Sequence, residues 1–424
     1  MAPPPSAPRV AVGIEALRDS GYAAIADKRV AALVHSASAF PDTLIHTVDA
    51  LAAAQGVQLE AILAPEHGFR GDRQAEHGDP KPYIDADTGI WVHSVYRKNT
   101  STLQALLREL RTQVVLVDIQ DAGTRLYTFV WTLYSLMQAA SLMAQPPAFL
   151  IADRPNPLGG LAVEGPVLNT SCCASRYGLA AVPHRHGLTV GELARLFGAK
   201  LARAAPAARA LNVTVLRMRR WRRAQLFDDT GLPWLPPSPN LPTAASALAY
   251  AATVFVEATT ASEGRGTTTP FQTIGAPFLN ASQLVRRLAA APVGHEHQTG
   301  GAARVARWRK EYFIPTFFKW NGSVCAGARL VRAPTAPGAS LFREGVHVLA
   351  AVRALASPPT AFAWDGRWFG QPGPVLIDRY AGTPRLRQLL DDPTAGGPDA
   401  VADAFEKEAR VFATVTRAPF LLYT

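Results

Sequence analysis

Short, continuously apolar runs alternate with longer segments of helical periodicity through the first half of the chain, and this alternation constrains the fold more than any other feature. The apolar runs cover residues 29–37, 59–64, 114–119, 148–153 and 212–218. Helical periodicity separates most of these runs, over residues 42–56, 101–113, 126–145 and 189–205. Strands that are apolar along their whole length are typical of a parallel sheet covered by helices on both faces. The pattern therefore predicts an α/β fold.

A change in composition marks a second region of the chain beyond about residue 235. Residues 232–243 are rich in proline and residues 262–278 in glycine, so both segments are expected to run as loops. Shorter alternating segments follow, with helical periodicity near residues 281–290, 343–356 and 398–412. We expect three parts: a disordered leader over 1–12, a main domain over 13–275, and a smaller α+β domain over 276–424 that closes a cleft.

The chain is basic, with 43 lysines and arginines against 33 aspartates and glutamates. Such an excess favours anionic partners, and its densest cluster runs from Arg217 to Arg223. No nucleic-acid-binding motif accompanies this cluster, so we expect an exposed basic segment and no nucleic-acid partner. No apolar stretch reaches the roughly 18–20 residues that span a bilayer, and the first residues lack the pattern of a secretory signal. The sequence predicts no membrane span and leaves a cytoplasmic and a secreted location both open.

Acidic side chains follow three strands of the predicted sheet. The first of these strands runs into the turn APEHGFRG (64–71), and the next two run into DIQDAGTR (118–125) and DRPNPLGG (153–160). The polar residues in and shortly after these segments include Glu66, His67, Asp118, Asp121, Arg125, Asp153 and Glu164. Ligands of open parallel sheets bind beyond the carboxyl ends of the strands, which lie about 4.8 Å apart. We therefore expect these acids to converge on one cleft.

Most of these polar residues also have a purely structural explanation. Asp118 and Asp153 can cap loops or pair with neighbouring arginines, and His67 can hydrogen-bond the backbone of its own turn. Glu263 and Arg265, in the later segment SEGRGT, can form an internal ion pair that holds a loop. The sequence alone leaves these structural roles open beside the functional ones.

Glu66 is the acid hardest to explain structurally, because a simple turn after proline is better served by Asp, Asn or Ser. The chain has no G-x-G-x-x-G after its first strand, no P-loop, no H-E-x-x-H and no G-x-S-x-G, so we expect no dinucleotide cofactor. Paired carboxylates suit glycoside hydrolysis, in which one protonates the leaving oxygen and the other attacks or activates water. Metal-assisted hydrolysis is the alternative, since His67, His77 and several aspartates are potential ligands.

Seven long motifs occur together in a fixed order along the chain. They are PEHGFRG (65–71), TGIWVHSVY (88–96), DIQDAGTRLYTF (118–129), DRPNPLGGLAVEGP (153–166), HGLTVGELA (186–194), WLPPSPNLPT (234–243) and SEGRGTTTPF (262–271). In this order they resemble the NamZ-type exo-β-N-acetylmuramidases. The resemblance extends from about Gly13 to Thr424, and seven ordered motifs form a far more specific signal than any single short pattern.

The resemblance implies a Rossmann-like, mostly parallel sheet that binds no dinucleotide, plus a smaller C-terminal domain, with the site between them. It implies release of N-acetylmuramic acid from the non-reducing end of peptidoglycan fragments, a small glycan substrate, without cofactor or metal. The catalytic candidates in matching motifs are Glu66, His67, Asp118, Asp121 and Glu164. The substrate-binding candidates are Arg70, Arg125, Tyr127, Asn156, His186, Asn240, Glu263 and Arg265.

Particular roles follow from the chemistry of that substrate. Muramic acid carries a lactyl carboxylate, which an arginine can hold through two parallel hydrogen bonds; Arg70 and Arg125 are candidates. A general-acid role for Glu66 would require burial or a neighbouring carboxylate to raise its pKa. Retention and inversion both stay open, because the outcome depends on the separation of the carboxylates. A metal-dependent hydrolase and a non-catalytic binder of anionic cell-wall glycans are the competing functions.

Overall fold

The computed structural model describes residues 9–74, 80–204, 208–291, 306–333, 339–364 and 375–424. Most of the predicted leader therefore lies outside the described residues. Its last residues pack against the main body, because Val10 and Val12 are buried and Ala11 forms a β-bridge with Arg219.

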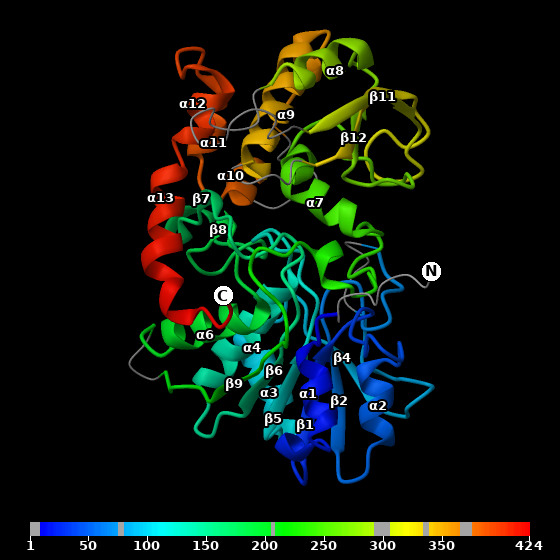
Figure 1. The fold of residues 1–424 in the computed structure, drawn as a ribbon, viewed down its shortest axis with the longest axis vertical. Coiled ribbons are helices and arrows are strands. Elements are labelled where there is room, and N and C mark those ends of the chain that lie inside the picture. Colours follow the sequence, from blue (N-terminus) through cyan, green and yellow to red (C-terminus); the bar gives the residue numbers. More distant parts are fainter. Residues whose placement is uncertain (1–8, 75–79, 205–207, 292–305, 334–338, 365–374) are drawn as a thin grey trace, which may run out of the picture.

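A seven-stranded sheet in the order β3-β4-β2-β1-β5-β6-β9 forms the core of the first region (Figure 1). Only the edge strand β3 is antiparallel to its neighbour. The strands are β1 (Arg29–Val34), β2 (Gln58–Ala64), β3 (Tyr83–Ile84), β4 (Trp91–Ser94), β5 (Val114–Asp118), β6 (Ala148–Ala152) and β9 (Val213–Leu216). The predicted mostly parallel sheet is confirmed, and each of the five apolar runs coincides with one of its strands to within a few residues.

Helices cover both faces of this sheet, as the apolar strands require. On one face, α1 (Gly13–Asp19) and α2 (Thr47–Ala53) pack side chains such as Ile14 and Val48 onto the strands. On the other face lie α3 (Thr100–Glu109), α4 (Phe129–Ser141) and α6 (Val190–Leu201), in the larger hydrophobic core. Within the described part of the chain, no helix is long and apolar enough to cross a membrane.

The second region is smaller and mixes helices with an antiparallel sheet, which confirms the expected α+β region. Its sheet has the order β10-β12-β11, with β10 (Thr273–Ala276), β11 (Arg307–Phe313) and β12 (Cys325–Arg332). Its helices are α7 (Ala244–Thr253), α8 (Ala281–Ala289), α9 (Leu341–Leu355), α10 (Leu376–Ala381), α11 (Arg385–Asp391), α12 (Gly397–Asp403) and α13 (Glu406–Val411). Three short elements extend from the first region: β7 (Glu164–Val167), α5 (Thr170–Cys173) and β8 (Pro183–Arg185).

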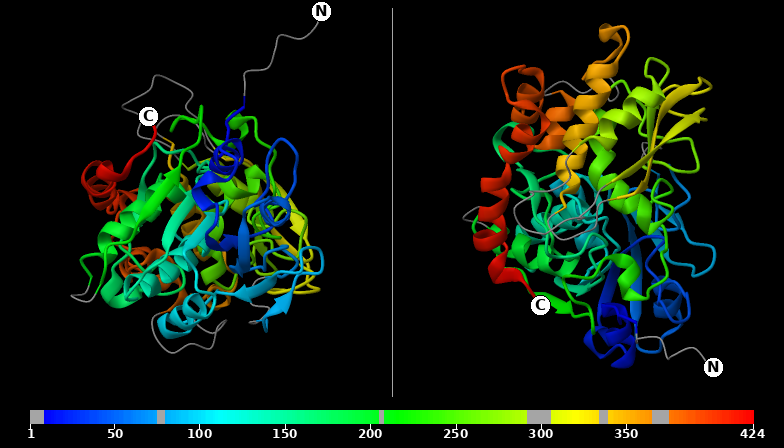
Figure 2. Two further views of the ribbon diagram at one scale, coloured as in Figure 1. Left: turned by 90° about the horizontal axis from the view of Figure 1, so that it is seen from below. Right: turned by 45° about the horizontal axis from the view of Figure 1, so that its top comes forward.

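The C-terminal segment returns to the first region and binds it. In Figure 1 and in the right-hand view of Figure 2, α13 runs down the side of the molecule and ends near α6. The Tyr423 hydroxyl donates a 2.7 Å hydrogen bond to Asp153, which is fully buried at the carboxyl end of β6. The Leu422 amide donates to Glu192 of α6. Asp153, the acid after the third of the strands singled out above, thus fixes the chain terminus.

Glu344, in α9, is an unusual buried acid of the second region. One carboxyl oxygen accepts a 2.7 Å hydrogen bond from the indole N–H of Trp308, and the other is buried with no partner among the described residues. Burial raises the pKa of Glu344 to about 7, although the hydrogen bond from Trp308 opposes this. The folded protein therefore holds this proton more tightly than the unfolded chain does.

Stability should consequently fall as the pH rises through the pKa of folded Glu344. Its contribution is complete below the unfolded pKa and is lost by about pH 7, with an upper limit of about 3 kcal/mol at roughly 1.4 kcal/mol per pKa unit. We expect Glu344→Gln to remove this loss, because the amide oxygen still accepts from Trp308 and carries no charge. Chemical denaturation between pH 5 and pH 8 measures the difference. Equal pH slopes in the variant and the parent protein would contradict the assignment, and Glu60→Gln, at a half-exposed acid of β2, is the control.

Candidate active site

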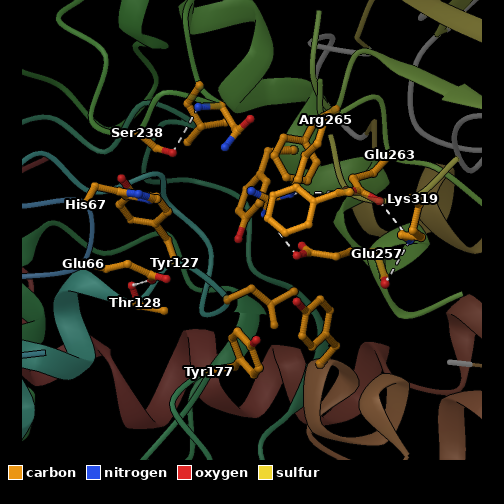
Figure 3. A pocket seen from close by; sticks show the side chains of 17 residues that line it. Glu66, His67, Tyr127, Thr128, Tyr177, Ser238, Glu257, Glu263, Arg265 and Lys319 are labelled. Carbon is orange, nitrogen blue, oxygen red and sulfur yellow. Dashed lines mark hydrogen bonds and ion pairs between the residues drawn. The ribbon is translucent and has the colours of Figure 1, made fainter. Parts of the chain in front are cut away.

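A pocket lies where the carboxyl ends of the parallel strands meet the second region (Figure 3). The empty space within it is about 750 Å³, including the part open to solvent. Its lining residues are Glu66, His67, Leu126, Tyr127, Thr128, Tyr177, Ser238, Asn240, Leu241, Tyr250, Glu257, Glu263, Arg265, Phe271, Phe318, Lys319 and Tyr380. Six of the thirteen residues proposed from the sequence are among them: Glu66, His67, Tyr127, Asn240, Glu263 and Arg265.

The sheet topology explains why Glu66 reaches this pocket. In the strand order, β1 lies between β2 and β5, and all three strands end at the same level, with Leu33 beside Leu63 and Val34 beside Asp118. From β1 the chain continues to β2 and β4 on one side of β1 in the strand order, and it later returns to β5 on the other side. Open α/β sheets bind ligands at such a switch point in the strand order. Glu66 follows β2, and the segment before α4 follows β5, so both meet above β1.

The turn after β2 is built to hold Glu66 and His67. His67 has a left-handed backbone with φ of 73°, and Gly68 continues it at 76°. The His67 ring bonds the Arg73 carbonyl oxygen through Nδ1 at 2.9 Å. Burial lowers the pKa of His67, with the negative charge of Glu66 opposing this, so the ring is neutral at pH 7. His67 therefore fixes the turn that presents Glu66.

Glu66 itself is half-buried and extends into the pocket. The Thr128 hydroxyl donates a 2.6 Å hydrogen bond to its Oε2 atom. Within the described part of the chain, Glu66 forms no ion pair, and its other oxygen has no hydrogen-bond partner. A carboxyl group held at one oxygen and open at the other can exchange protons with, or attack, a bound substrate.

A network of four charged groups forms the opposite wall of the pocket. Arg265 pairs with Glu257 at 3.0 Å and with Glu263 at 3.2 Å, and Lys319 pairs with Glu263 at 2.9 Å. The Lys319 ammonium group also donates to four backbone carbonyl oxygens in residues 256–261. Burial raises the pKa of Glu263, but Lys319 and Arg265 outweigh this effect and lower it overall. Glu263 is therefore ionised and holds the network together, which is the internal ion pair considered above.

The glycines of SEGRGT allow the close approach that this network requires. Gly264 and Gly266 both have left-handed backbones, with φ of 81° and 79°. A Cβ at Gly264 would lie 2.4 Å from the Thr273 carbonyl oxygen, and one at Gly266 would lie 2.6 Å from the Thr316 amide nitrogen. The segment that carries Lys319 thus packs directly against the loop that carries Arg265.

Aromatic rings form much of the remaining wall. The Arg265 guanidinium lies 5.0 Å from the centre of the Phe271 ring and 5.6 Å from that of Phe318, which limits its movement. Four tyrosines, whose ring contacts link Tyr127 to Tyr250 and Tyr177 to Tyr380, also line the cavity. Aromatic faces with a few polar groups between them are suited to binding a sugar ring.

Asp118 does not line the pocket, contrary to the catalytic role expected for it. It is fully buried, and Arg154 donates to both carboxyl oxygens, at 2.6 and 2.9 Å. Thr47 donates a third hydrogen bond to it. Both of its carboxyl oxygens are engaged within the fold, which fits the structural alternative.

Glu164 and Arg70, a catalytic and a substrate-binding candidate from the sequence, also lie outside the pocket. Glu164 pairs with Arg185 at 2.7 Å and accepts hydrogen bonds from Ser340 and the Phe342 amide, which joins β7 to the start of α9. Arg70 points to the other side of its turn and pairs with three aspartates, Asp49, Asp85 and Asp87. An arginine in that position cannot hold a substrate carboxylate in the pocket.

Arg125 and Asn156 are buried and hold the backbone. Arg125 donates to the carbonyl oxygens of Tyr177 and Tyr380, so it positions two pocket tyrosines without facing the cavity. Asn156 donates to the Leu188 carbonyl and accepts from the Leu158 amide. Neither residue lines the pocket, although both are substrate-binding candidates from the sequence.

Asp121 and His186 meet each other but do not line the pocket. They are buried, and His186 Nε2 lies 3.7 Å from Asp121 Oδ2, which is too far for a hydrogen bond. Asp121 Oδ2 accepts a hydrogen bond from the Gly123 amide. Asp121 therefore stabilises the backbone of the loop after β5. Neither residue lines the cavity, although the sequence predicts a catalytic role for Asp121 and a substrate-binding role for His186.

Several lining residues carry no recognisable signal in the sequence, above all Glu257, Lys319 and Thr128. Glu257 and Lys319 lie in segments without any motif of their own, VFVEA and FFKW, and are brought together only by the fold. Thr128 stands within the segment predicted as helix from residue 126, whereas α4 begins at Phe129. In the described residues, no group of three or more His, Cys, Asp or Glu side chains is arranged to hold a metal ion.

Carboxyl groups on two walls of an aromatic pocket suit a saccharide-processing enzyme, and the comparisons with known proteins agree. The family model for the N-terminal part of the exo-β-N-acetylmuramidase NamZ matches residues 30–245, and the model for its C-terminal part matches residues 248–423. The chain therefore belongs to the exo-β-N-acetylmuramidase NamZ family of glycoside hydrolases.

Individual relatives cover nearly the whole chain. The peptidoglycan β-N-acetylmuramidase NamZ of Bacillus subtilis (strain 168) is 35% identical over 417 residues, which cover 98% of this chain and 92% of that protein. Crystal structures of two DUF1343 family proteins from Bacteroides fragilis NCTC 9343 superpose with TM-scores of 0.80 and 0.72, at 28% and 25% identity. Each alignment covers 98% of this chain and 99% of the other. The family models meet between residues 245 and 248, and the boundary expected near residue 275 stays a prediction.

Proposed function

We propose that this protein is an exo-acting glycoside hydrolase that releases N-acetylmuramic acid from the non-reducing ends of peptidoglycan fragments. The single observation that carries the proposal is the position of Glu66, whose open carboxyl oxygen faces an aromatic pocket at the switch point of the sheet. Membership of the NamZ family, and the name of the Bacillus subtilis relative, support muramic acid as the sugar released.

Glu66 is the catalytic carboxyl group at the rim formed by the first region. The hydrogen bond from Thr128 holds its side chain in one orientation, and carboxylate catalysis depends on such fixed placement next to the glycosidic bond. The neutral His67 maintains the turn beneath it without adding a competing positive charge. The aromatic walls cover the faces of the bound sugar and exclude bulk water from them, so that its glycosidic bond is exposed to the carboxyl groups.

Arg265 is the group that binds the lactyl carboxylate of muramic acid. Two cations line the described pocket, but the three N–H donors of Lys319 are already engaged by carbonyl oxygens and Glu263. The guanidinium group has five N–H donors, of which Glu257 and Glu263 engage two nitrogen atoms. Arg265 thus retains donors for a further carboxylate, in the role that the sequence analysis gave to Arg70 and Arg125.

Replacing Arg265 with lysine should therefore reduce the preference for muramic acid. Lysine keeps the charge but lacks the planar fork that binds a carboxylate through two hydrogen bonds. We expect the ratio of kcat/KM for 4-nitrophenyl β-glycosides of N-acetylmuramic acid and N-acetylglucosamine to fall about 10-fold or more, at roughly 1.4 kcal/mol per tenfold change. An equal loss on both glycosides would show that Arg265 does not contact the lactyl group.

The proposed activity is tested with two disaccharides that differ only in their order. A disaccharide with N-acetylmuramic acid at the non-reducing end should yield free N-acetylmuramic acid, and one with N-acetylglucosamine at that end should stay intact. Turnover should be unchanged after treatment with EDTA, because the described residues offer no cluster of metal ligands. Activity lost to EDTA and restored by zinc or manganese would favour the metal-dependent alternative. Tight binding of the muramic-acid disaccharide without turnover would favour the non-catalytic binder.

A further inference from the structure

Glu257 is an acid of the pocket that neither the motifs nor the turn after β2 would suggest. It lies in the 3-10 turn Val254–Ala258 that directly follows α7. Its side chain is 16% exposed, and its Oε1 atom accepts a 3.0 Å hydrogen bond from Arg265. Within the described part of the chain, its Oε2 atom has no hydrogen-bond partner. One oxygen is therefore anchored and the other faces the cavity, as in Glu66.

Glu66 and Glu257 extend into the cavity from opposite walls (Figure 3). Glu66 comes from the first region, at the end of β2, and Glu257 comes from the segment that opens the second region. A sugar bound between the aromatic walls would therefore have one carboxyl group on each side. Most glycosidases use a pair of carboxyl groups that flank the bond to be broken.

The surroundings of Glu257 keep it protonated more readily than its neighbour Glu263. Burial raises the pKa of Glu257, and the nearby Glu263 adds to this, while Arg265 and Lys319 oppose it. Glu263 receives ion pairs from both cations, whereas Glu257 receives one from Arg265 alone. The other titratable groups of the pocket around it are Glu66, His67, Tyr127, Tyr177, Tyr250 and Tyr380.

We propose that Glu257 is the second catalytic carboxyl group and donates the proton to the leaving oxygen, while Glu66 acts as its ionised partner at the anomeric carbon. Glu257 thus takes the general-acid role that the sequence analysis considered for Glu66. The inference rests on the proposed glycosidase function. As the bond between C1 and the glycosidic oxygen breaks, its electron pair goes to that oxygen, which takes the proton from Glu257. Water then adds its hydroxyl to C1 and returns its proton to the carboxylate pair, so that the enzyme is restored.

Leaving-group dependence separates a proton donor from a structural acid. A 2,4-dinitrophenyl group leaves without protonation, whereas a sugar alcohol does not. We expect Glu257→Gln to lower kcat/KM about 10²–10⁴-fold on the muramic-acid disaccharide, and less than about 10-fold on 2,4-dinitrophenyl β-N-acetylmuramide. The alkaline limb of the pH profile for kcat/KM should disappear in the variant, because that limb reports the deprotonation of the acid.

Two further variants keep this test decisive. Glu66→Gln should lose activity on both substrates, since an ionised partner at C1 is needed whatever group departs. Glu263→Gln removes the other acid bound to Arg265, and any loss should be equal on the two substrates. A Glu257→Gln loss that is equal on both substrates, or an unchanged alkaline limb, would overturn the inference and leave the proposed function standing. Absence of turnover by the unaltered protein on both substrates would instead overturn the proposed function, and the inference with it.

Discussion

Replacement of Glu66 with glutamine is expected to lower kcat/KM on a disaccharide that ends in N-acetylmuramic acid by about 10²–10⁴-fold, the usual contribution of a positioned acid or base. The amide can still accept the 2.6 Å hydrogen bond from Thr128, so the side chain should keep its orientation while losing the ability to ionise. Release of free N-acetylmuramic acid, followed by chromatography, measures the effect.

The fold should be unaffected by this change, because Glu66 is half-buried and forms no ion pair within the described part of the chain. Thermal unfolding should therefore give the same midpoint as the parent protein to within about 2 °C, since surface changes of this kind stay within roughly 0.5 kcal/mol. Glu60→Gln is the matched control, because Glu60 lies on the same strand and pairs with Arg29 away from the pocket. Full activity in Glu66→Gln would rule out a catalytic role for Glu66.

Replacement of Asp118 with asparagine should have its largest effect on stability. Asp118 is fully buried between Arg154 and Thr47, and its neutralisation leaves the Arg154 guanidinium without a counter-charge. Breaking a buried ion pair by removing one partner typically costs about 3–5 kcal/mol. We expect a decrease of that size in the free energy of unfolding, measured by urea denaturation.

The activity of the folded Asp118→Asn protein distinguishes the two roles considered for this residue. Under conditions in which the variant is folded, kcat should stay within about 10-fold of the parent value, below the roughly 10²–10⁴-fold effect of a lost acid or base. Asp49→Asn, at an exposed ion pair with Arg70, should cost no more than about 1 kcal/mol. A stable Asp118→Asn protein with abolished turnover would restore the catalytic interpretation.

The fold was largely predictable because its signal is local. The central strand β5 is buried on both faces, so its continuous apolar run, 114–119, marks it directly in the sequence. The turn after β2 was also predictable, since Pro65 and Gly68 delimit it in the sequence. The ends of the helices were less certain. Periodicity extended one helix to residue 126, whereas Leu126 to Thr128 form part of the pocket wall before α4 begins.

The candidate site was only partly predictable, because a sequence motif does not show whether a side chain is buried or which way it points. Asp118 and Glu66 both follow strands and both belong to long motifs, yet one is enclosed by Arg154 and the other faces the cavity. Side chains on one turn also diverge, as Arg70 and Glu66 do. These distinctions depend on which partner each side chain meets across the fold.

Several residues contributed by the second region carry no signal in the sequence, although Glu263 and Arg265 do. Lys319 reaches the pocket only because its loop packs against Gly266, about fifty positions earlier in the chain, and Tyr380 arrives from α10. A single lysine or tyrosine in a segment without a recognisable motif does not indicate a function. Glu257 is the most important of these cases, because the structure sets it opposite Glu66.

The structure of the Glu66→Gln protein with the intact muramic-acid disaccharide would show where the two carboxyl positions stand relative to the glycosidic bond. We expect the glycosidic oxygen to lie within hydrogen-bond distance of Glu257, with residue 66 beside C1 and the lactyl carboxylate on Arg265. A disaccharide bound elsewhere, for example in the groove between Glu164, Arg185 and α13, would contradict this expectation, as would a sugar in the pocket with its glycosidic bond out of reach of both residues.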